Sequence, residues 1–387
     1  MPSNGNTPNN ILYIAAAGAG KTRLLIKDAL KNTGDTILIT TYTESNALEI
    51  VSRIKSSLGY IPSNVTVLPW FTFLLAHGVR PYQNVLNDEL HIKRIGFYLT
   101  DKKSGTYMGR NGETYMYGAE KDFYKHYFTN KESLKIYSDK VAKFTDEADE
   151  KLRQKRTKFG KVIERISRVF SRIYIDEVQD LAGYDLELVK KLLSTPSIIT
   201  MAGDPRQVTY LTHNPSKNQK YIDGGIDRYI KDKTSSSLCK IDYVTLNVSH
   251  RNNTSICEYS SRLYPAFDSI PSCNCAKCNQ PNIEHQGIFL IRKKDASAYL
   301  DTYKPTTLRY KDAVSPEWNF GKSKGMTFPR TLIYPTKAIE NWIFDNKSSL
   351  EYQTRCKFYV AITRAQYSVG IVSDRNNPEG NVNVWTP

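Results

Sequence analysis

Residues 11–22 have the composition of a cradle for nucleotide phosphates. They read ILYIAAAGAGKT, an apolar run followed by a glycine-rich turn that ends in Gly-Lys-Thr. Glycines let successive backbone N–H groups converge on a phosphate, Lys21 can reach the outer phosphates, and the Thr22 hydroxyl can complete a Mg2+ shell. The strict pattern requires glycine where Ala15 stands, so a strand-to-helix turn without a ligand is the alternative interpretation.

Carboxylates suited to metal-assisted hydrolysis follow another apolar run. Residues 172–180 read RIYIDEVQD, so a predicted strand ends in adjacent carboxylates, at the end where parallel α/β sheets bind ligands. Asp176 can supply the hard oxygen that Mg2+ prefers, and Glu177 can act as the base beside an attacking water. A solvated acidic cluster is the alternative, and the phosphate cradle upstream argues against it.

A third polar group follows the next predicted strand. Residues 201–210 read MAGDPRQVTY. Asp204 can cap the turn, Gln207 can orient water or contact the γ-phosphate, and Tyr210 can stack on a base. Taken alone, Gly-Asp-Pro is an ordinary turn, so this interpretation depends on the two segments above.

The chain alternates β-branched runs with helical patterns, which predicts parallel sheets covered by helices. The expected strands of the first half are residues 11–14, 35–43, 65–68, 172–175 and 197–201, with helices at 44–56 and 184–193. A second α/β pattern has expected strands at residues 243–246, 288–291, 307–310, 331–334 and 368–372. Residues 81–165 are charged, rich in Tyr and Phe and mostly helical in pattern, with a turn-rich stretch at 105–118, so we expect an insertion. Nothing after Asp374 has a strong pattern, and a loose C-terminal tail is expected.

The composition favours a polyanionic partner. The 387 residues include 54 Lys and Arg against 39 Asp and Glu, a net charge of +15, which favours nucleic acid over a membrane surface. No apolar run of about eighteen residues predicts a membrane span, and the polar N-terminus lacks a signal-peptide pattern. Six cysteines in a chain of this length do not form a disulfide framework, so we expect a cytoplasmic protein.

Seven segments, taken in order, resemble the motifs of superfamily 1 helicases of the UvrD/Rep/PcrA type. They are AAAGAGKTR, whose alanine at the first position is also found in that family, ITTYTESNA, IDEVQD, GDPRQVTY, LNVSHRN, SKGMTF and YVAITRA. The resemblance runs from about residue 11 to residue 372 and implies two RecA-like P-loop domains. We expect the first core at residues 1–80 and 166–237, a helical basic and aromatic insertion at 81–165, and the second core at 238–387 with a short Cys-rich loop at 272–286.

The resemblance implies roles for the residues around a nucleotide. Arg251 and Arg364 match arginines that reach the γ-phosphate from the second core, a task that suits a permanently charged, forked side chain. Arg23 matches a position that packs on adenine, and His250 stands where the family has a stacking aromatic residue. The expected catalytic residues are Lys21, Glu177, Gln207, Arg251 and Arg364. The expected ATP-binding residues are Ala17, Gly18, Ala19, Gly20, Lys21, Thr22, Arg23 and His250, with Thr22 and Asp176 at Mg2+.

The resemblance also implies contacts with a nucleic-acid strand. Tyr42 and Tyr210 match positions near the single strand, although core tyrosines are an equal alternative. Other expected contacts are Thr41, Thr43, Lys322 and Lys324, which could bind backbone phosphates. Trp70 and Phe71 lie in the region of another strand-contacting motif, but core packing is the preferred interpretation there. The basic run at residues 151–161 fits either the wall of a strand channel or a solvated helix face.

The chain departs from the family in its second half. Only about seventy residues separate Arg251 from Lys324, so the large regulatory subdomain is expected to be missing or vestigial. The family's Lys-Gly-Leu-Glu is here Lys-Gly-Met-Thr, which lacks a carboxylate. In the place of the subdomain, Cys273, Cys275, Cys278 and His285 could form a tetrahedral zinc site, and free thiols in a loop are the favoured alternative.

The resulting expectation is an ATP- and Mg2+-dependent translocase or helicase acting on single-stranded DNA or a tailed duplex. The preference for DNA and the 3′-to-5′ polarity come from the resemblance alone. Compact UvrD-like helicases also resemble the helicase subunits of anti-phage systems such as Gabija, where the partner is an OLD-family nuclease. The alternative function is therefore a nucleotide- or DNA-sensing ATPase that regulates a nuclease. A nucleic-acid-binding module with a degenerate ATPase is a third interpretation, disfavoured because the expected catalytic residues are present.

Overall fold

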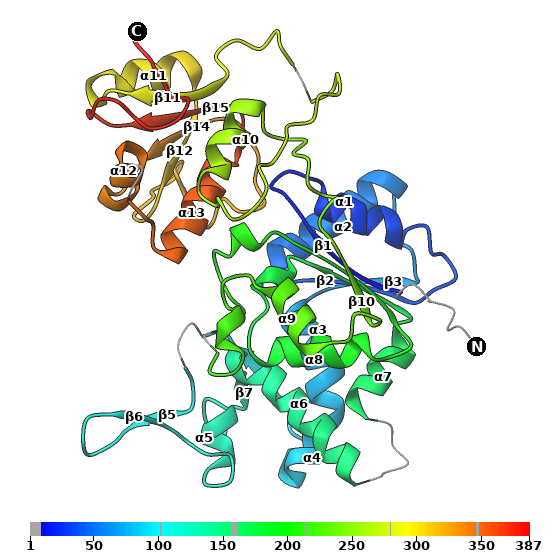
Figure 1. Ribbon diagram of the computed structural model, residues 1–387. Coiled ribbons are helices and arrows are strands. Elements are labelled where there is room, and N and C mark those ends of the chain that lie inside the picture. The colour runs from blue at the N-terminus through cyan, green and yellow to red at the C-terminus, as the bar shows by residue number, and fades with distance from the viewer. Residues whose placement is uncertain (1–8, 101–102, 156–160, 214, 279, 346–347) are drawn as a thin grey trace. The chain divides into compact units, whose positions relative to one another are not determined.

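The computed structural model describes residues 9–100, 103–155, 161–213, 215–278, 280–345 and 348–387 (Figure 1). The chain forms two compact units. The first comprises the described residues up to Tyr13, Thr22–Gly203 and Leu211–Asp242, and the second comprises Ile14–Lys21, Asp204–Tyr210 and Tyr243–Pro387. Each unit contains a six-stranded sheet. The predicted α/β fold class is confirmed, and the two sheets are consistent with two RecA-like domains.

The sheet of the first unit has the strand order β10-β1-β9-β8-β2-β3. The pairs β1–β10, β2–β3, β2–β8 and β8–β9 are parallel. The strand bounds are β1 Asn10–Ile14, β2 Ile37–Thr41, β3 Val65–Pro69, β8 Arg172–Asp176, β9 Ile198–Gly203 and β10 Cys239–Asp242. Helices α1 (Lys21–Ala29) and α2 (Glu44–Leu58) cover one face, while α8 (Tyr184–Leu193) and α9 (Ile226–Lys233) lie on the other (Figure 1). Strands buried on both faces require apolar residues throughout, which explains why β2 has no polar alternation.

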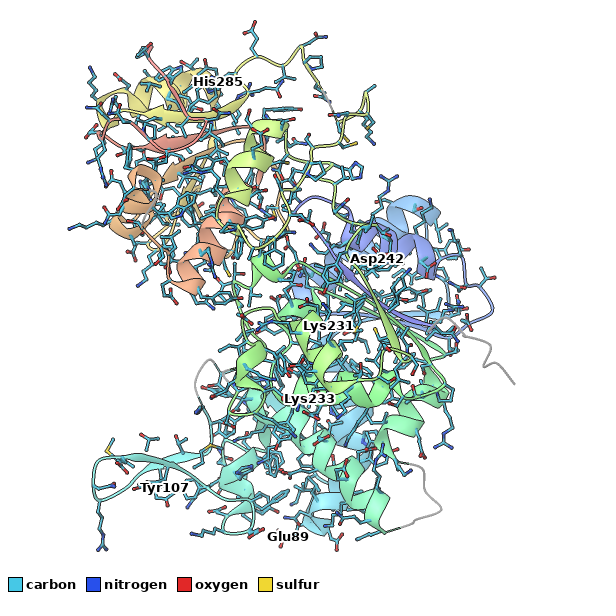
Figure 2. The ribbon with its side chains drawn as sticks, viewed as in Figure 1. Glu89, Tyr107, Lys231, Lys233, Asp242 and His285 are labelled. Atoms are coloured by element: carbon cyan, nitrogen blue, oxygen red, sulfur yellow. The ribbon has the colours of Figure 1, made fainter. Side chains whose placement is uncertain are left out.

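One predicted strand of the second half is wrong. Residues 243–246 form a turn, and the strand is the preceding β10, which pairs with β1 at the edge of the first sheet. The β-branched pattern there is misleading because Tyr243 and Val244 are exposed, Val244 by 74%. Asp242, at the end of β10, is labelled in Figure 2.

The segment between β3 and β8 contains helices and two small sheets. Its helices are α3 Trp70–Leu74, the π-helix η1 Leu75–Val79, α4 Gln83–Leu86, α5 Phe123–Tyr127, α6 Ser138–Gln154 and α7 Val162–Val169. The predicted mostly helical pattern misses the parallel pair β4 (Gly96–Tyr98) and β7 (Lys135–Tyr137), and the antiparallel hairpin β5 (Thr106–Met108) and β6 (Thr114–Met116). Tyr107 lies on this hairpin (Figure 2). The turn-rich stretch is therefore a hairpin, whose short exposed strands give no clear alternation.

The sheet of the second unit has the strand order β13-β12-β14-β15-β11-β16 and is also parallel. The strands are β11 Gly287–Ile291, β12 Thr306–Arg309, β13 Trp318–Asn319, β14 Phe328–Tyr334, β15 Ala365–Val372 and β16 Asn383–Val384. Helix α11 (Ala296–Tyr303) packs on one face through Tyr299, while α10 (Thr254–Ser261), α12 (Lys337–Phe344) and α13 (Tyr352–Ile362) lie on the other (Figure 1).

The expectation of a loose C-terminal tail is also wrong. Strand β16 pairs with β11, and the Trp385 backbone N–H donates to the Leu290 carbonyl at 3.0 Å. The Trp385 ring lies edge-on to Tyr299, with ring centroids 5.0 Å apart. A two-residue strand and one tryptophan give no periodic sequence signal, although together they anchor the chain end. Within the described parts of the chain, no helix is both long and apolar enough to cross a membrane.

Candidate nucleotide site

The turn between β1 and α1 has the geometry of an anion-binding loop. Gly18 and Gly20 adopt left-handed φ values of 73° and 85°, which permit neighbouring N–H groups to face a common side. Helix α1 begins at Lys21, which is buried, and its first turn holds no acidic residue. The positive helix end is therefore not neutralised by its own side chains.

Gly18 also permits close approach by the segment that carries a predicted arginine. A Cβ added at Gly18 would lie 2.6 Å from Arg251 Cβ and 2.8 Å from Ser249 Oγ, closer than real contacts allow. In the same segment, the His250 backbone N–H donates to the Gly18 carbonyl at 3.0 Å. The phosphate loop and Arg251, which are more than two hundred residues apart in sequence, are thus in direct contact within the second unit.

The two residues predicted to hold Mg2+ lie together in the first unit. Thr22 Oγ1 donates to Asp176 Oδ2 at 2.6 Å, and Asp176 is 3% exposed at the end of β8. A hydroxyl and a carboxylate at this separation are hard oxygen donors of the kind that Mg2+ prefers. The donor set therefore fits the ion.

Glu177 follows Asp176 in a strained backbone conformation. Its φ of 54° and ψ of 40° are left-handed, which is uncommon for a residue with a side chain and is concentrated at functional sites. Its backbone N–H donates to Asp176 Oδ1 at 3.0 Å, and the Gln179 side-chain amide donates to its carboxylate. The bond from Gln179 fixes the orientation of the Glu177 carboxylate.

The turn after β9 is a closed network of polar side chains. Asp204 accepts bonds from Arg206 Nε at 2.8 Å and from Gln207 Nε2 at 2.7 Å. Arg206 is buried, and its Nη2 donates to the Ala15 carbonyl at 2.7 Å, which fixes the start of the phosphate loop. The carboxylate of Asp204 raises the pKa of Arg206 despite burial. Arg206 was not among the predicted site residues, although its position beside a capping aspartate was an available signal.

Arg364 completes this network from the turn between α13 and β15. It is 1% exposed, and its Nη2 donates to Gln207 Oε1 at 3.1 Å, so the Gln207 amide is held at both ends. Its Nε and Nη1 donate to the carbonyls of Val360 and Met326 at 3.2 and 3.3 Å. Arg251 Nη1 donates to the Thr363 carbonyl at 3.2 Å. Arg251 therefore contacts the phosphate loop and Arg364 contacts the turn after β9, the two turns predicted to act on phosphate.

Of the remaining nucleotide-site predictions, Arg23 is exposed on α1 and Ala17 and Ala19 are buried in the loop. Tyr210 lies beside the turn that carries two predicted contact lysines, since a Cβ added at Gly321 would lie 2.7 Å from the Tyr210 hydroxyl. In that turn, Lys322 is exposed and Lys324 is half-buried. These three predicted nucleic-acid contacts are therefore grouped in the second unit.

The contacts predicted after β2 lie in the first unit. Tyr42 is half-buried with its ring edge-to-face against Phe71, at 5.9 Å. Thr41 is buried, and Thr43 caps α2 by accepting from the Asn46 N–H at 3.2 Å. Trp70 and Phe71 are buried, and Trp70 Nε1 donates to Asp185 at 2.8 Å, so the preferred interpretation of core packing is confirmed.

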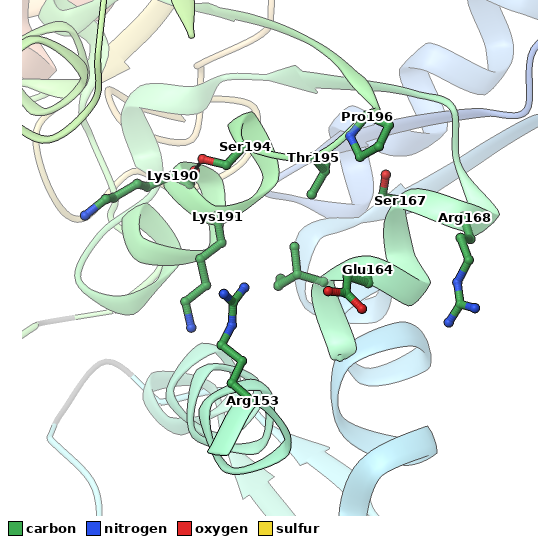
Figure 3. Close-up of a pocket in the computed structure, with 10 residues that line it drawn as sticks. Arg153, Glu164, Ser167, Arg168, Lys190, Lys191, Ser194, Thr195 and Pro196 are labelled. Atoms are coloured by element: carbon green, nitrogen blue, oxygen red, sulfur yellow. Dashed lines mark hydrogen bonds between the residues drawn. The ribbon is translucent and has the colours of Figure 1, made fainter. Parts of the chain in front are cut away.

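A separate cavity of about 620 Å³ has basic walls (Figure 3). Its lining includes Arg153 and Lys191, and Arg153 belongs to the predicted basic run at residues 151–161. Residues 156–160 of that run lie outside the described residues. Lys191 binds Asp146 at 2.7 Å and Arg153 binds Asp149 at 2.9 Å, so both cations are neutralised. The cavity also lies near the starts of β8 and β9, whereas nucleotides bind at the carboxyl ends of such strands. It is therefore not the nucleotide site.

The prediction that His285 is a zinc ligand is wrong. Its ring is stacked between Phe289 and Tyr303, with centroids 3.8 and 3.7 Å away, and its Nε2 lies 2.8 Å from the Tyr299 hydroxyl. Burial, with a contribution from Arg330, lowers the pKa of His285 to about 4. It lies beside α11 in the second unit (Figure 2). This histidine belongs to the aromatic packing of the sheet, not to the cysteines.

One family model matches part of the chain. Residues 83–213 match the family model of the UvrD/REP helicase N-terminal domain. This segment is similar to UvrD/REP helicases. The match includes Asp176, Glu177 and Gln207 and begins after the phosphate loop.

Solved structures that resemble the chain include the arterivirus nonstructural protein 10 helicase, alone and in complex with DNA. The first has 14% identity and a TM-score of 0.42, over 95% of this chain and 60% of that one. The second has 14% identity and a TM-score of 0.44, over 94% of this chain and 61% of that one. The chain thus spans about 60% of the length of these helicases. No curated protein matches the sequence.

Proposed function

We propose that the chain is an ATP-hydrolysing translocase that moves along a single nucleic-acid strand. The observation that carries the proposal is the pair formed by Gln207 and Arg364, whose side chains are 3.1 Å apart. A buried arginine whose guanidinium donates to a polar side chain just after a β-strand can detect and stabilise a γ-phosphate. The similarity of residues 83–213 to UvrD/REP helicases supports the same conclusion.

The roles of the residues follow from their chemistry. The N–H groups of the loop and Lys21 bind the phosphates, and Thr22 and Asp176 hold Mg2+, which neutralises charge on the β- and γ-phosphates when bound. Glu177 accepts a proton from the attacking water, and Gln207 positions that water or the γ-phosphate. Arg251 and Arg364 stabilise the charge that develops as the terminal phosphate leaves.

Gln207 also provides a route from hydrolysis to the strand. Tyr210 is three residues further along the same turn and contacts Gly321, beside exposed Lys322. A shift of Gln207 as the γ-phosphate is lost would therefore be transmitted through a short turn to an aromatic ring and a basic loop. Stacking on a base is independent of sequence, which a translocating enzyme requires. We propose DNA as the strand and 3′-to-5′ as the direction, following the helicase family.

Two variants separate nucleotide binding from hydrolysis. Lys21→Ala removes the phosphate-binding cation, so we expect weakened ATP binding. Glu177→Gln keeps the size of the side chain but removes the base, so we expect normal ATP binding with hydrolysis lowered by about 10²–10⁴-fold. Nucleotide titration and phosphate release measure the two properties. Full hydrolysis by Glu177→Gln would contradict the assignment.

A second candidate is a regulatory ATPase that controls a partner nuclease, such as one of the OLD family. It is favoured by the short connection between α10 and β11, where residues 262–278 and 280–286 contain no helix or strand of the sheet. The segment is too short for a regulatory subdomain, which makes unwinding by the chain alone less expected than ATPase activity. A stable nuclease complex combined with weak strand displacement would favour this candidate, whereas vigorous unwinding by the pure chain would exclude it.

A further inference from the structure

The Cys-rich loop contacts the segment that carries Arg251. The Cys273 backbone N–H donates to the Ser249 carbonyl at 2.8 Å, and the Ser249 N–H donates to the Pro271 carbonyl at 2.9 Å. Ser249 and Ser272 form a parallel bridge. This pairing places His250 opposite the cysteines, although it precedes them by more than twenty residues.

The side chains then converge on one point. The ligand atoms of His250, Cys273 and Cys278 all lie within 4.8 Å of one another. Cys275 stands between these two cysteines in sequence, and its thiol hydrogen-bonds to the thiols of Cys273 and Cys278. His250 and Cys275 are exposed and the other two are half-buried, so an ion can enter from solvent.

We propose that Cys273, Cys275, Cys278 and His250 bind one zinc ion. Three thiolates and one imidazole are one of the usual tetrahedral ligand sets of structural zinc, with Zn–S bonds of about 2.3 Å and a Zn–N bond of about 2.0 Å. Tetrahedral angles then separate sulfur from nitrogen by about 3.5 Å. The observed distance from Cys278 Sγ to His250 Nδ1 is 3.6 Å.

The ion would stabilise a loop that has no core of its own. Residues 272–278 are exposed or half-buried, and each of the four ligands comes from an irregular segment. A structural zinc ion supplies folding free energy in such loops by replacing hydrophobic packing. It also fixes His250, whose backbone N–H donates to the Gly18 carbonyl, and thereby holds Arg251 against the phosphate loop.

Metal content of the full-length protein tests the proposal independently of the proposed function. Purification from zinc-supplemented cells should give about one zinc per chain by elemental analysis. His250→Asn and Cys275→Ser should each lower zinc affinity at least tenfold, whereas the matched control His285→Asn should keep the wild-type content. Equal losses in His250→Asn and His285→Asn would overturn the proposed ligand set.

Cobalt gives a readout that does not depend on the stability of the variants. Wild-type protein stripped of metal and loaded with Co2+ should show the intense visible absorption of tetrahedral cobalt together with thiolate charge-transfer bands. Zinc content below about a tenth of an ion per chain, with Co2+ giving only the weak spectrum of the aqueous ion, would overturn the proposal and leave the cysteines as free thiols.

Discussion

At the scale of single residues, the contact between Arg364 and Gln207 carries the proposed chemistry. Arg364→Lys keeps the charge but removes the fork that donates to Gln207, Val360 and Met326. An arginine that stabilises phosphoryl transfer is worth about 10³–10⁵-fold in rate, so we expect kcat to fall at least 10³-fold with a smaller change in KM. Steady-state ATPase kinetics measure this effect.

Arg309→Lys is the matched control for Arg364→Lys. Arg309 lies on β12 of the second sheet and pairs with Glu317 at 2.6 Å, with Gln207 not among its partners. We expect its kcat to remain within about twofold of wild type. A similar loss of kcat in both variants would contradict the role of Arg364.

The two left-handed glycines of the phosphate loop form a second matched pair. Alanine at either position adopts an unfavourable φ, which costs about 1–2 kcal/mol. Only Gly18→Ala also collides with Arg251 and Ser249, whereas the space at Gly20 is open. Overpacking adds about 1–3 kcal/mol, so without nucleotide the free energy of unfolding should fall further for Gly18→Ala than for Gly20→Ala. Equal losses in denaturant titrations would contradict the close approach at Gly18.

Residue types predicted the pair Thr22 and Asp176, which lie together, but selected the wrong histidine beside the cysteines. Thr22 and Asp176 are 154 positions apart, yet both were predicted, Thr22 because it follows a glycine-rich turn and Asp176 because it ends an apolar strand. His285 was chosen as a zinc ligand because it is close to the cysteines in sequence. Pairing between distant segments brings His250 there instead, and such pairing leaves no local pattern.

At the scale of elements, His285 makes the packing of β11 and α11 sensitive to pH. The pKa of this histidine is lowered from 6.5 to about 4, chiefly by burial, so the folded state favours the neutral ring. The stabilisation is complete above about pH 6.5 and is lost as the pH falls towards 4. We therefore expect the unfolding midpoint of wild type to fall over this window more than that of His285→Gln. Parallel pH profiles for the two proteins would contradict this role.

The C-terminal strand β16 is the second element with a measurable contribution. Trp385 is half-buried against Tyr299 and Tyr303. Full burial of an aromatic side chain is worth about 3–5 kcal/mol, so Trp385→Ala should cost about 2 kcal/mol in denaturant unfolding. Val384, which is 52% exposed, provides the control, since Val384→Ala should cost much less. No loss in Trp385→Ala would mean that the chain end does not contribute to the sheet.

Long buried strands and amphipathic helices were predictable, whereas short or exposed elements were not. Helix α8 was expected at residues 184–193 and has those bounds, because its apolar periodicity and acidic first turn agree. β10 was missed because its residues are less β-branched than the exposed turn that follows. The hairpin of β5 and β6 was missed because its strands have three residues each.

At the scale of the whole molecule, the net charge of +15 should make strand binding depend on salt. Each phosphate contact contributes a slope of about −0.7 to log K against log salt for single strands. Lys322→Ala should therefore weaken binding of all sequences alike and reduce the slope by about one contact. Lys55→Ala, an exposed lysine at the end of α2, should leave the slope unchanged. Fluorescence anisotropy at several salt concentrations distinguishes the two.

The central claim is that hydrolysis at the phosphate loop is coupled to a nucleic-acid strand. The coupling depends on turns that follow β1 and β9 of the first sheet but belong to the second unit, namely Ile14–Lys21 and Asp204–Tyr210. The most direct test compares steady-state ATP hydrolysis by the full chain with and without single-stranded DNA. We predict at least a tenfold increase in kcat on adding the strand, and none in Glu177→Gln. The same kcat with and without single-stranded DNA or RNA would contradict the account.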